Sequence, residues 1–380
     1  MSEEARIREL HRMRQSIWLD NLSRRLLQSG ELERLRGRGV TGITSNPTIF
    51  QKAISGSEVY DEGIRRLVAA GREASQIIWD LMIEDVTAAA DVFRPVYDEC
   101  QGEDGFVSIE VSPAVAHSVE RTLAMVRELR ERTARPNVMV KIPATSEGVP
   151  AIRQAIAEGA NINVTLIFAV SRYVDVVEAF QAGLEERQKA GGRLDDVRSV
   201  ASFFVSRVDT KVDGLIDERL RDAPAKDRDR LQALRGTIGI ANSKAAYQRF
   251  QELHGGDRWA ALARAGARPQ RCLWASTSVK DERYPDTMYA DNLIGPGTID
   301  TLPEPALEAF IDHGEVRRTL DAGLEDARGR LDELARLGID LGRVTDELEE
   351  EGVRAFAKSY DELEQTISGE AQKVRGAGSG

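Results

Sequence analysis

The sequence predicts an α/β fold, a single (β/α)8 TIM barrel with extra helices, including C-terminal helices. Eight short apolar or alternating runs recur along the 380-residue chain, and most are separated by stretches with apolar residues at i, i+3 and i+4. Alternating strands and helices indicate a parallel sheet. Eight such strands in succession are typical of a barrel, which takes about 250 residues before insertions, so the chain has room for additional helices.

We expect strands at residues 16–20, 42–45, 106–111, 137–142, 163–168, 200–205, 271–275 and 288–293. Helical spacing is clear between several of them, as at 115–129 and 173–184. The stretches 51–101 and 208–270 are each long enough for several helices, and nearly all of the chain beyond residue 303 has a helical pattern.

The domain organisation follows from the absence of a Pro/Ser-rich linker and of an internal repeat. We therefore expect one domain over residues 1–375, with its last helical pattern at 354–367. A glycine-rich, flexible tail is expected at 376–380.

Residues 37–42 match GxGxxG, the dinucleotide-binding fingerprint. That fingerprint must follow a strand and open a helix. Here a helical pattern precedes the match and a strand follows it, so we expect an ordinary helix-to-strand turn.

The charge balance excludes several classes of partner. Asp and Glu number 63 against 52 Lys and Arg, which gives a formal net charge of −11 and a pI near 5.2. An acidic surface repels phosphate backbones, so we expect neither nucleic acid nor a membrane surface as a partner. A small phosphorylated substrate stays open, because a local basic pocket can override the overall charge.

The sequence favours a cytoplasmic protein. No apolar run approaches the ~18 residues that span a bilayer, and the opening MSEEARIREL lacks the apolar core of a signal peptide. Cys100 and Cys272 are too few for a disulfide framework. The histidines lie far apart, without the spacing of metal ligands, so we expect no metal and no cofactor.

The most informative residue is Lys141, which interrupts an apolar strand near its C-terminal end. Side chains alternate along a strand, so residues 138, 140 and 142 share one face while Met139 and Lys141 share the other. If the first set packs under the helices, Lys141 points into the barrel mouth. Desolvation there disfavours the charged ammonium, as an amine nucleophile requires. The alternative is a lysine whose head reaches from the strand end into solvent.

Polar side chains also lie at the ends of other predicted strands, namely Asp20, Asn46, Glu110, Asn163, Thr165 and Ser202. The C-terminal face of a barrel is where such side chains build an active site. Asp20, Asn46 and Thr145 could instead cap the helices that follow. Glu110 and Lys141 lie on strands, where capping does not explain them.

A lysine with two carboxylates and several neutral donors suits Schiff-base chemistry on a sugar ketone. The lysine attacks the carbonyl, and a carboxylate working through water supports the dehydration. The resulting iminium acts as an electron sink while the second carboxylate takes a hydroxyl proton and the C–C bond breaks. Amides and hydroxyls would hold the sugar hydroxyls.

Five segments, at residues 18–24, 42–50, 140–145, 161–168 and 273–278, resemble the transaldolase family in its longer bacterial form. They include Thr-Ser-Asn-Pro at 44–47 and Lys-Ile-Pro-Ala-Thr at 141–145. The resemblance implies a metal-independent transferase of the non-oxidative pentose phosphate pathway. Such an enzyme moves a dihydroxyacetone unit from sedoheptulose 7-phosphate to glyceraldehyde 3-phosphate, giving erythrose 4-phosphate and fructose 6-phosphate.

The resemblance also implies residue roles. Lys141 matches the family's Schiff-base lysine, and Asp20 matches the general acid/base for C–C cleavage. Glu110 matches the carboxylate that positions the catalytic water together with Thr165. The residues that match substrate-binding positions are Asn46, Asn163 and Ser202 for the dihydroxyacetone unit and Arg207 and Ser276 for the phosphate.

The sequence departs from the family's pattern at one of the phosphate-binding positions. Shorter members of the family follow the seventh strand with Ala-Ser-Phe-Arg, whereas this chain has Ala-Ser-Thr-Ser-Val-Lys at 275–280. Ser278 or Lys280 could take over from the missing arginine, and a surface role for Lys280 is the alternative.

Two other functions stay open. A Schiff-base fructose 6-phosphate aldolase would release free dihydroxyacetone, but those family members are much shorter and carry Gln in place of Glu110. A non-catalytic sugar-phosphate-binding barrel would need Arg207 and Ser276 but not Lys141 with two carboxylates. A monomer and a homodimer are equally compatible with the sequence.

Overall fold

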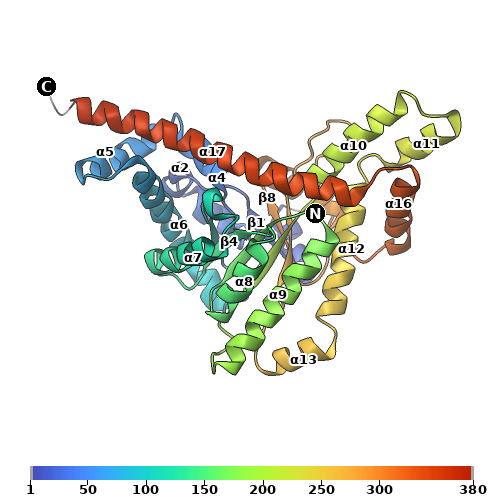
Figure 1. The fold of residues 1–380 in the computed structure, drawn as a ribbon, viewed down its shortest axis with the longest axis horizontal. Helices are drawn as coiled ribbons and strands as arrows, with labels where there is room; N and C mark the ends of the chain where they lie inside the picture. Colours follow the sequence, from blue (N-terminus) through green and yellow to red (C-terminus); the bar gives the residue numbers. More distant parts are fainter. Residues whose placement is uncertain (1–2, 378–380) are drawn as a thin grey trace.

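A computed structural model describes residues 3–377 as a closed barrel of eight parallel strands, arranged in chain order and surrounded by helices (Figure 1). The strands are β1 (Gln15–Leu19), β2 (Gly42–Ile43), β3 (Val107–Glu110), β4 (Val138–Pro143), β5 (Ile162–Ile167), β6 (Ser199–Phe204), β7 (Arg271–Ala275) and β8 (Thr298–Leu302). The barrel closes where β1 pairs with β8, in a register that runs from Gln15 beside Thr298 to Leu19 beside Leu302. The predicted fold class is confirmed, as are the first seven strands.

The predicted eighth strand, at 288–293, is wrong. Met288–Asn292 forms the short helix α14, in which Asn292 Nδ2 donates to the Met288 carbonyl oxygen at 2.8 Å. The closing strand lies later, at Thr298–Leu302, and all five of its residues are buried. This strand contains two threonines and Asp300, so it is not an apolar run and was not predicted as a strand. Its β-branched threonines nevertheless favour strand structure.

The helices in chain order are α1 (Glu3–Arg12), α2 (Arg24–Gln28), α3 (Glu31–Gly37), α4 (Pro47–Ile54), α5 (Asp61–Ala69), α6 (Ala74–Glu99), α7 (Val119–Thr133), α8 (Gly148–Ala157), α9 (Val170–Lys189), α10 (Ser206–Leu220), α11 (Ala225–Leu234), α12 (Ile238–Leu253), α13 (Asp257–Arg264), α14, α15 (Glu304–His313), α16 (Leu324–Arg336) and α17 (Leu341–Ala377). Two short 3-10 helices, η1 (Glu58–Tyr60) and η2 (Pro113–Val115), accompany them. The stretches 51–101 and 208–270 therefore hold several helices each, as expected. Within residues 3–377, no helix combines the length and the apolar character needed to cross a membrane.

The GxGxxG match covers the end of α3 and the turn into β2, so the predicted helix-to-strand turn is confirmed. Gly39 has a φ of +105°, and a Cβ there would stand 2.7 Å from Ile7 Cγ2. Glycine is required at this position by backbone conformation and by packing against α1, without any nucleotide.

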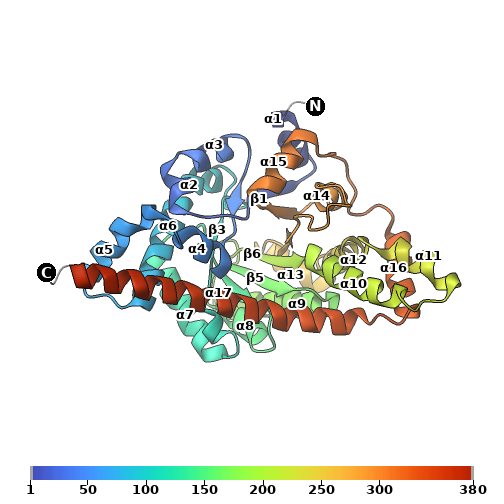
Figure 2. The same ribbon diagram turned by 90° about the horizontal axis from the view of Figure 1, so that it is seen from above.

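The last helix, α17, is 37 residues long and crosses the barrel as one rod, from beside α10 to beside α5 (Figures 1 and 2). Polar contacts join it to the elements it crosses: Lys211 of α10 pairs with Glu351 at 2.6 Å, and Thr48 of α4 bonds Ser359 at 2.7 Å. The helix includes residues 376 and 377 of the predicted tail, and residues 378–380 lie outside the described residues.

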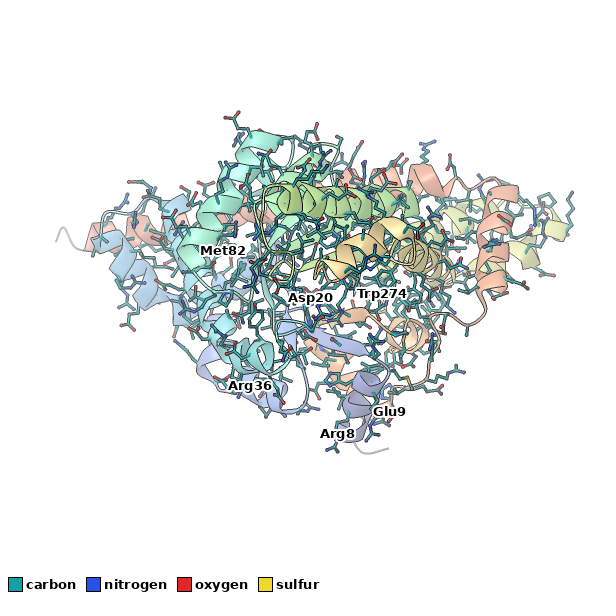
Figure 3. All side chains as sticks on the ribbon, turned by 90° about the horizontal axis from the view of Figure 1, so that it is seen from below. Arg8, Glu9, Asp20, Arg36, Met82 and Trp274 are labelled. Atoms are coloured by element: carbon teal, nitrogen blue, oxygen red, sulfur yellow. The ribbon has the colours of Figure 1, made fainter. Side chains whose placement is uncertain are left out.

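Inside the barrel, side chains form layers because alternate residues of each strand point inward. The middle layer is apolar and buried, and its members are Trp18, Phe106, Met139, Val200, Leu273 and Ile299. Val140 and Ile142 of β4 pack outward in the core shared with the helices, so the predicted faces of this strand are confirmed. Figure 3 shows Asp20, which follows β1, near the centre of the molecule in that view.

Candidate active site

The carboxyl ends of the strands, here named the C-terminal mouth, surround a cavity of about 290 Å³. Eight of the predicted site residues line it, namely Asp20, Asn46, Lys141, Ser202, Arg207, Ser276, Ser278 and Lys280. The other three, Glu110, Asn163 and Thr165, are buried beside it on β3 and β5. The topology thus brings residues from seven strands and their following loops to one site.

Lys141 is buried in this mouth, with 4% of its surface exposed, so it does not reach out into solvent. Its Nζ donates to the Ser45 carbonyl oxygen at 3.2 Å and lies 3.4 Å from Glu110 Oε2. The register explains this proximity, because Glu110 of β3 and Asn163 of β5 stand on either side of Lys141. The amine is therefore held between two neighbouring strands and faces a carboxylate.

Glu110 can exchange a proton near neutral pH. Burial raises the pKa of its carboxyl to about 7, although the nearby Lys141 ammonium opposes the rise. Its Oε2 and the Oγ1 of Thr165 are buried and have no hydrogen-bond partner among the described residues. Glu110 Oε2, 3.4 Å from the amine, and Thr165 Oγ1 on β5 are thus two polar atoms suited to hold a water.

Thr165 lies at an irregularity of β5. The register between β5 and β6 shifts between Val164 and Ile167, and Leu166 has a left-handed φ of +58°. An irregularity of this kind re-aims side chains and is common next to active sites. Helix α17 covers the spot, since a Cβ added at its Gly352 would stand 2.8 Å from Leu166 Cδ2.

Asp20 follows β1, two strands away from Glu110 of β3 in the barrel order. Thr44 Oγ1 donates to its carboxylate at 2.8 Å and contacts Thr301 Oγ1 at 2.6 Å. Burial raises the pKa of Asp20, while the charge of Lys141 and the hydrogen bond from Thr44 oppose the rise. Asp20 does not cap the next helix, because Ser23 provides the side-chain cap of α2.

The amides and hydroxyls form a chain across the floor of the site. Asn163 Nδ2 donates to Ser108 Oγ at 3.0 Å, and Ser202 Oγ donates to Asn163 Oδ1 at 2.7 Å. Asn46 has both of the functions considered for it: its Oδ1 caps α4 by accepting from the Ile49 backbone N–H at 3.0 Å, and the residue lines the cavity.

Positive charge gathers on one side of the cavity. Half-buried Arg207 lies 5.2 Å above the Phe204 ring and makes no ion pair or hydrogen bond among the described residues. Lys280 Nζ donates to Ser278 Oγ at 2.5 Å, and burial together with Arg207 and Lys52 lowers the pKa of Lys280. Arg207, Lys280 and Lys52 line the same cavity as Lys141.

Sequence reasoning missed several lining residues, namely Thr44, Lys52, Thr301 and Phe356. A signal existed for Lys52, because it follows Asn46 and Ile49 at steps of three along α4 and so shares their helix face. No signal existed for Phe356, which reaches the mouth from α17, far along the chain.

Comparisons with known proteins agree with this geometry. The family described as transaldolase/fructose-6-phosphate aldolase matches residues 17–367. The transaldolase of Parafrankia sp. (strain EAN1pec) is 48% identical over 354 residues, 93% of this chain and 94% of the relative. That of Thermobifida fusca is 47% identical over 350 residues (92% and 93%), and that of Trichodesmium erythraeum is 41% identical over 370 residues (96% and 97%). The resemblance seen in the sequence is confirmed.

Proposed function

The chain belongs to the transaldolase/fructose-6-phosphate aldolase family, and on that premise we propose that it is a transaldolase. It transfers a dihydroxyacetone unit from sedoheptulose 7-phosphate to glyceraldehyde 3-phosphate through a Schiff base on Lys141. The observation that carries the proposal is the buried Lys141 amine, 3.4 Å from Glu110 and in one cavity with Asp20.

The first step forms the Schiff base. The Lys141 amine, in its neutral form, attacks the ketone carbon of the donor, and the carbonyl oxygen becomes the hydroxyl of a carbinolamine. That hydroxyl leaves as water when it receives a proton. Glu110, whose pKa is about 7, can supply the proton through a water held with Thr165.

The second step breaks the C–C bond. Asp20 takes the proton of the C4 hydroxyl, the bond between C3 and C4 breaks, and its electron pair moves into the iminium to form an enamine. The aldose leaves with its new carbonyl group. The enamine carbon then attacks the aldehyde of the acceptor, Asp20 returns the proton to the new hydroxyl, and hydrolysis of the iminium frees the product and Lys141.

The cations select phosphorylated substrates. Arg207, Lys280 and Lys52 line the cavity, and no carboxylate of residues 3–377 is bound to any of them, so a phosphate group would be their counter-ion. Ser278 and Lys280 act together in this proposal: the hydroxyl orients the ammonium, which carries the charge in place of the family's second arginine. Ser276 adds a hydroxyl from the loop after β7.

Borohydride trapping tests the proposal. The protein is mixed with fructose 6-phosphate without acceptor and reduced, and its intact mass and peptide map are measured. We expect a three-carbon adduct on Lys141 and little free dihydroxyacetone. An adduct with continuous release of dihydroxyacetone would favour the aldolase, and an unmodified Lys141 would overturn the Schiff-base proposal. The matched control is Lys226→Ala, which removes an exposed lysine of α11.

The proposal extends to the setting of the enzyme. We place it in the cytoplasm, in the non-oxidative pentose phosphate pathway. Cys100 and Cys272 are both free, and burial raises the pKa of the Cys272 thiol to about 12, which suits a core residue rather than a redox site. Every residue of the mechanism comes from one chain, so the reaction is compatible with a monomer and with a homodimer.

A further inference from the structure

The amino-terminal ends of the strands, here named the N-terminal mouth, hold a second cavity of about 340 Å³. It shares no lining residue with the candidate active site, because the apolar middle layer of the barrel separates the two. The residues of that layer that form its floor are Trp18, Phe106, Met139, Val200 and Ile299. The second cavity thus ends blindly on a surface of aromatic and aliphatic side chains.

Four arginines surround this apolar floor: Arg14, Arg198, Arg268 and Arg271. They come from the turn before β1, the residue before β6, the loop before β7 and the first residue of β7. Arg14, Arg198 and the neighbouring pair Arg268 and Arg271 are far apart in the sequence, and the closure of the barrel brings them together. The net charge of the chain is −11, so this cluster of positive charge is opposite in sign to the chain as a whole.

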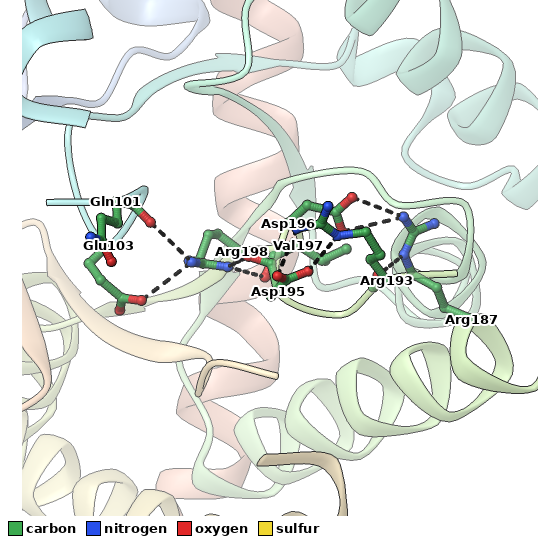
Figure 4. Close-up of polar contacts among 8 residues, drawn as sticks. All are labelled: Gln101, Glu103, Arg187, Arg193, Asp195, Asp196, Val197 and Arg198. Atoms are coloured by element: carbon green, nitrogen blue, oxygen red, sulfur yellow. Dashed lines mark hydrogen bonds and ion pairs between the residues drawn. The ribbon is translucent and has the colours of Figure 1, made fainter. Parts of the chain in front are cut away.

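Two of the guanidinium groups are fixed in place. Arg198 is 9% exposed, and it donates to the Asp195 carbonyl oxygen at 2.7 Å while a second nitrogen lies 3.3 Å from Glu103 Oε1 (Figure 4). Arg271 donates from one nitrogen to Ser16 Oγ and to the Thr298 carbonyl oxygen, both at 2.7 Å. Their positions are set by the fold, so binding an anion would cost them little conformational entropy.

The carboxylates nearby do not balance the four arginines. Asp104 already accepts from Trp18 Nε1 at 2.7 Å and from Thr41 Oγ1 at 3.0 Å, and Arg271 lies 3.6 Å from it. Among the described residues, Glu103 is the one carboxylate that lines the cavity, and Arg268 pairs with it at 2.9 Å. Exposed Arg14 makes no side-chain hydrogen bond or ion pair among the described residues.

We propose that this cavity binds a small organic oxyanion with an apolar body, the oxyanion on the arginines and the body on the floor that includes Trp18 and Met139. Planar guanidinium groups bind carboxylate and phosphate oxygens in pairs, so both head groups fit. The floor distinguishes such a ligand from an inorganic ion, which gains nothing from apolar contact. This inference is independent of the reaction at the other mouth.

Phenyl phosphate, benzoate and inorganic phosphate are the probes. To exclude binding at the C-terminal mouth, they are titrated by calorimetry into the Arg207→Ala/Lys280→Ala protein, and the indole N–H resonance of Trp18 is followed by NMR. We expect phenyl phosphate or benzoate to bind at least about tenfold more tightly than inorganic phosphate and to shift that resonance. The stronger of the two identifies the head group.

Adding Arg14→Ala and Arg268→Ala should weaken that binding about tenfold or more, because two cations that would contact the oxyanion are lost. Both side chains are exposed, so their loss should leave the fold intact. Arg264→Ala, an exposed arginine on α13, is the matched control and should change nothing. A thermal melt verifies that each variant is folded. The proposal is overturned if no probe binds, if inorganic phosphate binds equally well, or if the double arginine variant binds as its parent does.

Discussion

The two mouths of the barrel carry positive charge in different chemical forms. At the C-terminal mouth, lysines 52, 141 and 280 and a single arginine surround polar side chains. At the N-terminal mouth, four arginines surround an apolar floor. Lysine can lose its proton and react, whereas arginine stays charged at every accessible pH. The same eight strands thus present side chains suited to a reaction at one end of the barrel and, as we propose, side chains suited only to binding at the other.

The largest effect should come from Lys141→Ala, since Lys141 is the proposed nucleophile at the C-terminal mouth. We expect kcat to fall on the order of 10⁴-fold, because no covalent intermediate can form. A coupled assay of erythrose 4-phosphate formation measures it. Lys226→Ala should retain full activity. Comparable turnover in the two variants would show that the C-terminal mouth does not use Lys141 as a nucleophile.

The next effect tests the layer that separates the mouths. Met139→Ala opens a cavity within it, and we expect the free energy of unfolding to fall by about 2–5 kcal/mol. Met139→Leu keeps the volume and should cost less than about 1.5 kcal/mol. Urea denaturation measures both. Equal stability of Met139→Ala and the parent protein would mean that the layer is not close-packed.

A smaller effect is expected for Arg207→Ala, which removes a cation that stands over Phe204. The KM for fructose 6-phosphate should rise by about 10- to 100-fold, since a charge-assisted contact to phosphate is lost. The KM for unphosphorylated fructose should not change. Steady-state kinetics distinguish the two, with Arg264→Ala as the control, and an equal rise for both sugars would contradict a phosphate role.

The last effect concerns the loop that carries Ser276, Ser278 and Lys280. Thr277 Oγ1 donates to Asp300 Oδ1 at 2.9 Å, and burial raises the pKa of the Asp300 carboxyl to about 7. The unfolded carboxyl has a pKa near 3.9, so the stability gained from its proton is complete below about pH 4 and lost as the pH rises through about 7.

Asp300→Asn should therefore flatten the fall in Tm between about pH 5 and pH 8, as measured by calorimetry. The exposed Asp332→Asn is the control and should keep the slope of the parent protein. An unchanged slope in Asp300→Asn would show that this carboxyl does not hold its proton near neutrality.

Much of the fold and site could be predicted, because the alternation along each strand determines which side chains face inward. Lys141 beside Glu110 follows from that rule and from parallel pairing alone. The left-handed Leu166 and the contribution of Phe356 could not be predicted, since both depend on how α17 packs across the mouth. The arginines of the N-terminal mouth were missed for a related reason: they lie in turns and at strand starts, where no period relates them.

The apolar layer also determines the order of events in a turnover. Trp18, Met139 and Ile299 close the barrel below Lys141, and the cavities at its two ends share no lining residue. In the proposed mechanism, the aldose released from the donor must therefore leave on the side from which the acceptor enters. Donor and acceptor would then take turns on Lys141, which is the kinetic pattern of a ping-pong enzyme.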